Sequence, residues 1–420
     1  MKHGACGLDF GTSNSTLGIM KDGKPSLVSL EDDQPTLPSA IFYNYDDEKT
    51  YFGRDALAEY IGGAEGRLMR SLKSVLGTTL MNETTQLKKR RIAFPDIIRE
   101  FVAHLKKTAE AKAGTPLTHV VVGRPAHFVD DDPEADAQAQ SQLEEIIRKT
   151  GFTDIEFQFE PIAAAFEYEM TAEPRNELAL IVDIGGGTAD FSIIRTGSGR
   201  ANHPDRSDDI LATYGVHVGG TDIDRILALD KIMPLLGYLT RLKGKQRLPV
   251  PSWIYSDLAT WHRINLLYSH TLRTQVAQMI LEAEKPDLLK RLANVLQHKK
   301  GHYLLGCAEA MKVALSDHET TTMDLDIGAD GFPIEIARID FATMLTPWLN
   351  AISSAMTKTL SLGGVEANDI HAVFLTGGTS LSLPVRQRVQ QMFGDARMVT
   401  GDSLGSVGLG LTLAAARRFQ

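Results

Sequence analysis

This chain of 420 residues has only two cysteines, no long apolar run and no excess of basic charge. Its only cysteines are Cys6 and Cys307, and no N-terminal basic-then-apolar segment resembles a signal peptide, so we expect a reducing, cytoplasmic setting. No apolar stretch is long enough to span a bilayer, which argues against a membrane protein. The formal net charge of −9 argues against a general surface for nucleic acid or anionic lipid.

The residues that are present can build a large core, because 43% of them are hydrophobic. Helical spacing at 97–105, a β-branched run at 119–122 and helical spacing again at 135–149 predict an α/β fold. A mixed segment at about 35–95 and a mostly helical one at about 222–315, in which Trp253 and Trp261 are expected in the core, are interpreted as inserts. We therefore predict two lobes, 1–172 and 173–420.

Two copies of one glycine-rich motif lie far apart in the chain, at 9–14 (DFGTSN) and at 183–188 (DIGGGT). An apolar segment precedes each motif and another follows it, a pattern that predicts strand, tight turn and strand. Glycine has no Cβ and tolerates φ > 0, as we expect at Gly187, so the turn's N–H groups can converge on an anion. Either motif alone is compatible with an ordinary hairpin, but the pair predicts a duplicated fold with nucleotide between its halves. The predicted phosphate-binding residues are Gly11, Thr12, Ser13, Asn14, Gly185, Gly186, Gly187 and Thr188.

Carboxylates accompany both turns. Asp9 and Asp183 end the first strand of each motif, and Asp190 follows the second motif by two residues. Mg²⁺ keeps several waters and takes few protein ligands, so these carboxylates are suited to hold a hydrated ion beside the phosphates.

Further motifs follow in a fixed order at 160–165 (EPIAAA), 218–224 (VGGTDID), 308–316 (AEAMKVALS) and 374–379 (FLTGGT). Together with the two glycine-rich turns, they resemble the nucleotide-binding domain of the seventy-kilodalton heat-shock (DnaK-like) chaperones. Within that family, the chain is most similar to a truncated bacterial subgroup made of little more than the ATPase domain. The resemblance implies the actin-like ATPase fold, a duplicated ribonuclease H-like fold whose two lobes carry inserts and enclose the nucleotide in a cleft.

The same resemblance implies roles for individual residues. Lys73 would reach the γ-phosphate of ATP, and Glu160 would help to place the attacking water. Asp9, Asp183 and Asp190 would hold the hydrated Mg²⁺ and polarise that water. The remaining nucleotide contacts would come from Gly219, Gly220, Glu309, Lys312, Ser316, Gly377, Gly378 and Thr379.

Two departures from the family pattern bear on function. Val313 and Leu381 stand where the chaperones place two arginines around adenine, so the base would be held by apolar contact. The chain ends at Gln420, directly after the ATPase domain, so we expect no C-terminal substrate-binding domain.

We therefore expect an ATP-binding, Mg²⁺-dependent ATPase that releases ADP and phosphate and acts as a chaperone-like switch on an unknown protein partner or client. A monomer is one option for its oligomeric state. Three alternatives share the fold: a filament protein of the actin or MreB type, a sugar-kinase-like phosphotransferase and a pseudo-ATPase scaffold. The chaperone-like motifs argue against the first, the lack of a substrate-binding base against the second, and intact Lys73, Glu160 and Asp183 against the third.

Overall fold

The computed structural model describes residues 4–88, 90–129, 132–171, 176–197, 200, 206–243, 247–261, 263–327, 331–400 and 405–419. The chain divides into two compact units. The double-sheet unit comprises Met1–His217, Ile352–Leu381 and Arg386–Gln420, and the helical unit comprises Val218–Ala351 and Ser382–Val385. The lobe boundary predicted at 172 and 173 lies outside the described residues and stays a prediction.

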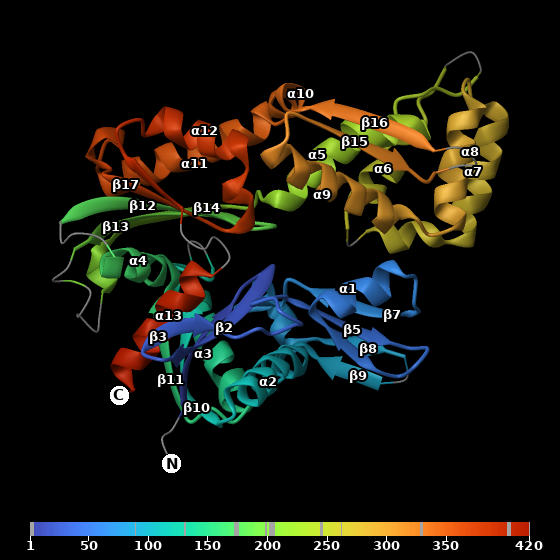
Figure 1. Cartoon of the computed structure of the whole chain (residues 1–420). Helices are drawn as coiled ribbons and strands as arrows, with labels where there is room; N and C mark the ends of the chain where they lie inside the picture. Colours follow the sequence, from blue (N-terminus) through green and yellow to red (C-terminus); the bar gives the residue numbers. More distant parts are fainter. Residues whose placement is uncertain are drawn as a thin grey trace. The chain divides into compact units, whose positions relative to one another are not determined.

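Two five-stranded paths of identical topology form the double-sheet unit (Figure 1). In each, a central strand forms an antiparallel hairpin with the next strand and pairs in parallel with a later one on its other side. This repetition confirms the prediction of a duplicated α/β fold. The first sheet has the order β11-β10-β1-β2-β3, built from β1 (Gly4–Phe10), β2 (Asn14–Lys21), β3 (Lys24–Leu27), β10 (Leu117–Arg124) and β11 (Asp154–Phe159), with β4 (Thr36–Pro38) pairing to β2. The second has the order β14-β13-β12-β17-β18, built from β12 (Glu177–Ile184), β13 (Ala189–Thr196), β14 (Ile210–Val216), β17 (Ala372–Thr376) and β18 (Arg397–Thr400).

Helices bury the apolar faces of these sheets. α2 (Phe94–Ala113) turns Ile97, Phe101 and Leu105 inward, the spacing of one helical face. The C-terminal helix α13 (Ser406–Arg418) packs closely on α4 (Glu160–Thr171). Gly410 allows this contact, since a Cβ there would collide with the Ala163 carbonyl. The remaining helices beside the sheets are α3 (Pro133–Arg148), α11 (Thr346–Gly363) and α12 (Leu383–Met392).

Among its described residues, the segment 35–95 contains short strands, the α-helix α1 and two 3-10 helices, a mixture that its sequence indicated. That this segment is an insert stays a prediction. Its three-stranded sheet has the order β6-β5-β7, and a separate hairpin joins β8 to β9. The 3-10 helix η1 (Leu72–Val75) places Lys73. The other bounds are β5 (Ala40–Asn44), β6 (Thr50–Phe52), α1 (Gly53–Ile61), β7 (Gly66–Arg70), β8 (Thr84–Leu87) and β9 (Arg90–Ala93).

The helical unit spans all of the segment 222–315 that was predicted as the second insert. Its elements are α5 (Gly220–Leu227), α6 (Ser252–Leu258), α7 (His270–Glu282), α8 (Pro286–Gln297), α9 (Gly301–Asp317), β15 (Thr320–Leu325), β16 (Phe332–Ala337) and α10 (Arg338–Met344). The prediction that Trp253 belongs to the core is wrong, because its side chain is 50% exposed. The short helix α6 turns Ile254, Tyr255 and Leu258 inward instead, and Trp253 lies on the other face.

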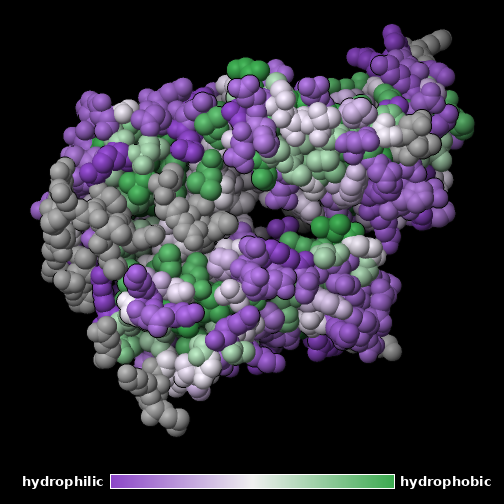
Figure 2. Space-filling view, viewed as in Figure 1, coloured by the Kyte–Doolittle hydropathy of each residue, from purple (hydrophilic) through white to green (hydrophobic). Residues whose placement is uncertain are grey.

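Hydrophobic side chains lie mainly inside the units. The face shown in Figure 2 is largely hydrophilic, with hydrophobic residues in small, separate areas. Within the described ranges, no helix combines the length and the apolar character needed to cross a membrane.

Candidate active site

Carboxylates from both sheets meet at the carboxyl ends of the central strands, where ligands of open α/β sheets bind. Asp9 lies next to the end of β1, and Asp183 next to the end of β12. Register places Asp190 of β13 and Thr376 of β17 on either side of Asp183. The three predicted carboxylates therefore belong to one region of the double-sheet unit.

Lys73 and Glu160, which are 87 positions apart, form an ion pair in this region. The Nζ of Lys73 donates to the Oε1 of Glu160 at 2.6 Å, and the two side chains are only 10% and 16% exposed. Gly123 lies against the Glu160 side chain, because a Cβ added at Gly123 would lie only 3.3 Å from the Glu160 Oε1. Burial acts to lower the pKa of Lys73, but Glu160 and Asp9 outweigh it, so the pKa is raised and the ammonium keeps its charge.

The carboxylates sit in an environment that disfavours their accumulated negative charge. Burial, reinforced by Glu160, raises the pKa of Asp9 to about 7. Burial, with Glu160 again, raises the pKa of Asp183 to about 6, although the Thr376 hydroxyl bonds to this carboxylate and opposes the shift. Asp190 keeps an exposed surface, but burial of the carboxyl and the charge of Asp183 raise its pKa to about 7. Such a cluster favours a bound cation.

The crowded, buried carboxylates of Asp9, Asp183 and Asp190 supply the negative charge to which the waters of a hydrated cation bind. In the part of the chain that the structure describes, no three His, Cys, Asp or Glu side chains are arranged to coordinate a metal ion themselves. Mg²⁺ commonly keeps several of its waters, which hydrogen-bond to carboxylates like these. The residues present therefore fit the group that the sequence resemblance implies.

The first glycine-rich turn is packed against its own chain. The Ser39 hydroxyl donates to the Gly11 carbonyl at 2.6 Å, and the Ser39 N–H donates to the Ser13 carbonyl at 2.8 Å. A Cβ at Gly11 would collide with the Asn14 carbonyl oxygen. The hydroxyl of Ser13 accepts from the N–H of Gly186 at 3.3 Å, so the two turns are in contact.

The second turn is held at its ends and open at its tip. The Gly185 N–H donates to the Thr188 carbonyl, and the Thr379 hydroxyl donates to the Gly185 carbonyl, both at 3.0 Å. A Cβ at Gly187 would meet no atom within 4 Å. The expectation of φ > 0 at Gly187 is wrong, since the residue is absent from the described positive-φ glycines. The absence of a side chain at Gly187 leaves open space at the turn. Gly377 has φ > 0 instead.

Gly377 occupies the conformation that was expected at Gly187. Its φ is +76°, and a Cβ would lie 2.6 Å from the Asp183 Oδ1. Only glycine fits this position without strain. Gly377 lets the segment after β17 pass beside Asp183, and Gly378 and Thr379 follow it in a 3-10 helix, η8 (Gly378–Leu381).

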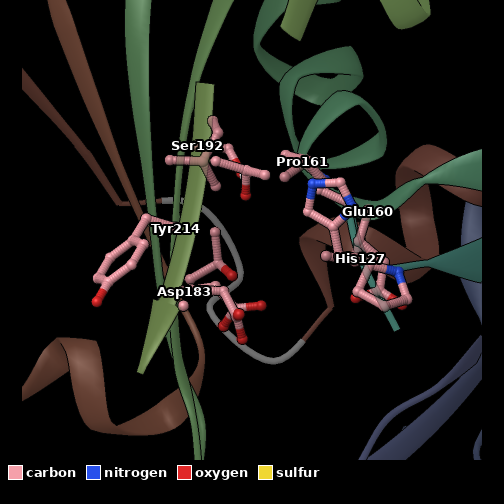
Figure 3. A pocket seen from close by; sticks show the side chains of 15 residues that line it. His127, Glu160, Pro161, Asp183, Ser192 and Tyr214 are labelled. Carbon is pink, nitrogen blue, oxygen red and sulfur yellow. The ribbon is translucent and has the colours of Figure 1, made fainter. Parts of the chain in front are cut away.

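A pocket extends from the carboxylates between two walls of the double-sheet unit (Figure 3). Asp183, Ser192 and Tyr214 come from strands of the second sheet, whereas Glu160 and His127 come from α4 and from the loop after β10. The sequence prediction missed His127, Ser192, Tyr214 and Thr376. Of these, only Thr376 ends its strand; the pocket positions of the others follow from the pairing of the strands and carry no signal in the sequence.

The other predicted nucleotide-binding residues form a second group, inside the helical unit. Glu309, Lys312 and Ser316 lie on α9, and the Nζ of Lys312 is 2.7 Å from the Asp224 Oδ1 and 3.5 Å from the Gly220 carbonyl. Lys312 therefore joins α9 to the Gly219–Gly220 turn at the start of α5. Val313 follows it on α9 and is 58% exposed.

Comparison with known proteins assigns the chain to a family. Residues 5–232 and 290–416 match the family described as "Hsp70 protein", and the chain therefore belongs to the Hsp70 family. Its fold is the actin-like ATPase fold of that family, as predicted.

Similar curated proteins are chaperones by name. The chain is 24% identical to "Chaperone protein dnaK1" of Synechocystis, an alignment covering 93% of this chain and 51% of that protein. It is 25% identical to "Chaperone protein HscA homolog" of Vibrio parahaemolyticus, covering 97% and 57%. The chain thus spans about half the length of the curated relatives it matches.

Proposed function

We propose that this protein binds ATP with Mg²⁺ and hydrolyses it to ADP and phosphate. The observation that carries this proposal is the buried Lys73–Glu160 pair beside three carboxylates, next to a glycine turn with open space at Gly187. Phosphoryl transfer requires positioning and charge neutralisation rather than covalent chemistry by the protein. A charged lysine, oriented carboxylates and backbone donors provide those two functions.

The residues have separate tasks in this mechanism. Backbone N–H groups at the tip of the second turn and the Ser13 hydroxyl donate to phosphate oxygens, while the Thr188 hydroxyl bonds to the Asp190 carboxylate and positions it. The Lys73 ammonium neutralises charge on the terminal phosphate, and Glu160, fixed by Lys73, orients the attacking water. A bound Mg²⁺ would supply further neutralisation of the phosphates, with Asp9, Asp183 and Asp190 holding its waters.

The nucleoside would be bound by the second group of residues. We assign the ribose and base to Gly219, Gly220, Glu309, Lys312 and Ser316 of the helical unit. Gly377, Gly378 and Thr379 follow β17 in the double-sheet unit and are proposed separately as nucleotide-binding residues. Val313 and Leu381 are 58% and 38% exposed, so each has apolar surface available for a base. Contact without a stacking guanidinium predicts modest discrimination among purine bases.

The names of the relatives, which call them chaperone proteins, support a chaperone-like role for this chain. We infer that the client or partner of this chain is a protein and that ATP hydrolysis resets the interaction.

The proposal is tested by measuring Mg·ATP affinity and single-turnover phosphate release for wild type and Lys73→Met. We expect the variant to hydrolyse bound ATP at least about a hundredfold more slowly, because one preorganised charge is removed. Lys106→Met is the matched control, since Lys106 forms a comparable pair with Glu110 at 2.9 Å on α2. Equal rates in wild type and Lys73→Met would contradict the assignment of Lys73.

A further inference from the structure

Arg124 ends β10, directly before the loop that forms one wall of the pocket. Its side chain is only 14% exposed, and none of the sequence motifs includes it. The guanidinium carries five N–H donors in a rigid plane. The partners of those donors determine what the residue holds in place.

Two of the partners are carbonyls of the pocket wall. The Nε of Arg124 donates to the Pro125 carbonyl at 3.1 Å, and an Nη donates to the Ala126 carbonyl at 3.2 Å. Residues 125–127 form no strand or helix, so these carbonyls have no ladder to satisfy them. Arg124 therefore fixes the backbone of the loop that forms the same wall of the pocket as Glu160.

Two further partners anchor the guanidinium itself. Arg124 donates to the Gln140 Oε1 at 2.5 Å and to the Asp136 Oδ2 at 2.8 Å, both on α3. The second oxygen of Asp136 accepts from the Phe128 N–H at 2.5 Å. The far end of the loop is thus tied to the same carboxylate that holds Arg124.

The face of the guanidinium contacts the residue adjacent to Glu160. Its central carbon lies 4.9 Å from the centre of the Phe159 ring and 5.5 Å from that of Phe128. Phe159 ends β11, pairs in register with Arg124, and is followed directly by Glu160 at the start of α4. One side chain therefore touches both the segment that carries Glu160 and the loop beside it.

We propose that Arg124 is a positioning residue that holds Glu160 and the adjacent loop 125–127 in fixed positions on one wall of the pocket. The inference rests on the proposed ATP hydrolysis, since a fixed Glu160 matters for orienting an attacking water. Lysine cannot replace arginine in this role, because an ammonium has no planar face and cannot reach four separated acceptors at once.

The test compares wild type, Arg124→Lys and Arg148→Lys. Arg148 is the matched control, because it lies at the other end of α3 and also donates to a backbone carbonyl, that of Thr153, and to a carboxylate, that of Glu144. Three quantities are measured on the full chain: amide hydrogen exchange, the Kd of Mg·ATP and single-turnover phosphate release.

For Arg124→Lys we expect faster exchange in two segments, 125–128 and 159–162, about tenfold slower hydrolysis, and a Kd within about twofold of wild type. Arg148→Lys should match wild type in all three. Faster exchange with unchanged hydrolysis would overturn the proposal, because Arg124 would then be structural only. Unchanged exchange in both segments would also overturn it. If wild type neither binds nor hydrolyses ATP, the proposed function fails, while the exchange data still decide whether Arg124 fixes the segment of Glu160.

Discussion

The two glycine turns have the same topology and similar sequences, yet they use glycine differently. At the first turn, a Cβ on Gly11 would collide with the Asn14 carbonyl, and Ser39 ties the turn down. At the second turn, a Cβ on Gly185 would have the Thr188 carbonyl oxygen as its nearest neighbour at 3.8 Å, and one on Gly187 would meet nothing within 4 Å. Glycine is thus required for folding in the first turn, and it leaves room for a ligand in the second.

The largest effect should follow from filling the open turn. We predict that Gly187→Val weakens Mg·ATP binding by about a hundredfold, because the side chain occupies space next to the backbone donors and removes charge-assisted hydrogen bonds. Its thermal unfolding should match wild type, since no neighbouring atom is displaced. Calorimetric titration and a melting curve measure both quantities. Unchanged affinity would show that phosphate does not bind at this turn.

In the first, packed turn, a substitution should lower stability instead of ATP affinity. We predict that Gly11→Ala lowers the free energy of unfolding by about 2 kcal/mol, the cost of forcing an atom into filled space. Gly185→Ala is the matched substitution in the second turn and should change it by less than about 0.5 kcal/mol. Urea unfolding of the two variants gives the comparison. Similar losses in both would remove the distinction between the turns.

A smaller effect is expected at the residue that ties the first turn. Ser39→Ala removes the 2.6 Å hydrogen bond to the Gly11 carbonyl and should cost about 1 kcal/mol of unfolding free energy. Amide exchange should rise across 11–14 and stay unchanged across 185–188. Equal amide exchange across 11–14 in wild type and Ser39→Ala would mean that the packing of the first turn does not depend on Ser39.

The sequence was sufficient to predict the features that are local in the chain. Each hairpin with its aspartate follows from a strand pattern around a glycine turn, and the repeated pattern predicted the repeated sheet. The backbone angle at Gly187 was predicted wrongly, because open space and φ > 0 both favour glycine and the sequence does not separate them. Trp253 was misplaced for a related reason, since a seven-residue helix has too few positions to define its buried face by spacing alone.

Features that depend on pairing between distant segments could not be predicted from residues alone. The contact between Lys73 and Glu160 depends on where the insert meets the first sheet, and the family resemblance, not the spacing, indicated both residues. Arg124 and His127 belong to no motif. The register of β10 with β11, which places Arg124 opposite Phe159, is known only once the strands are paired.

Single-turnover hydrolysis of saturating Mg·ATP by wild type and Asp183→Asn tests the central claim most directly. Asp183 lies between Asp190 and Thr376 in the sheet register, and asparagine keeps its shape while removing its charge. We predict measurable hydrolysis by wild type, a rate at least about a hundredfold lower for Asp183→Asn, and similar ATP binding by both. Absence of hydrolysis in wild type, or equal rates in the two proteins, would contradict the assignment of this carboxylate cluster as the active site of an ATPase.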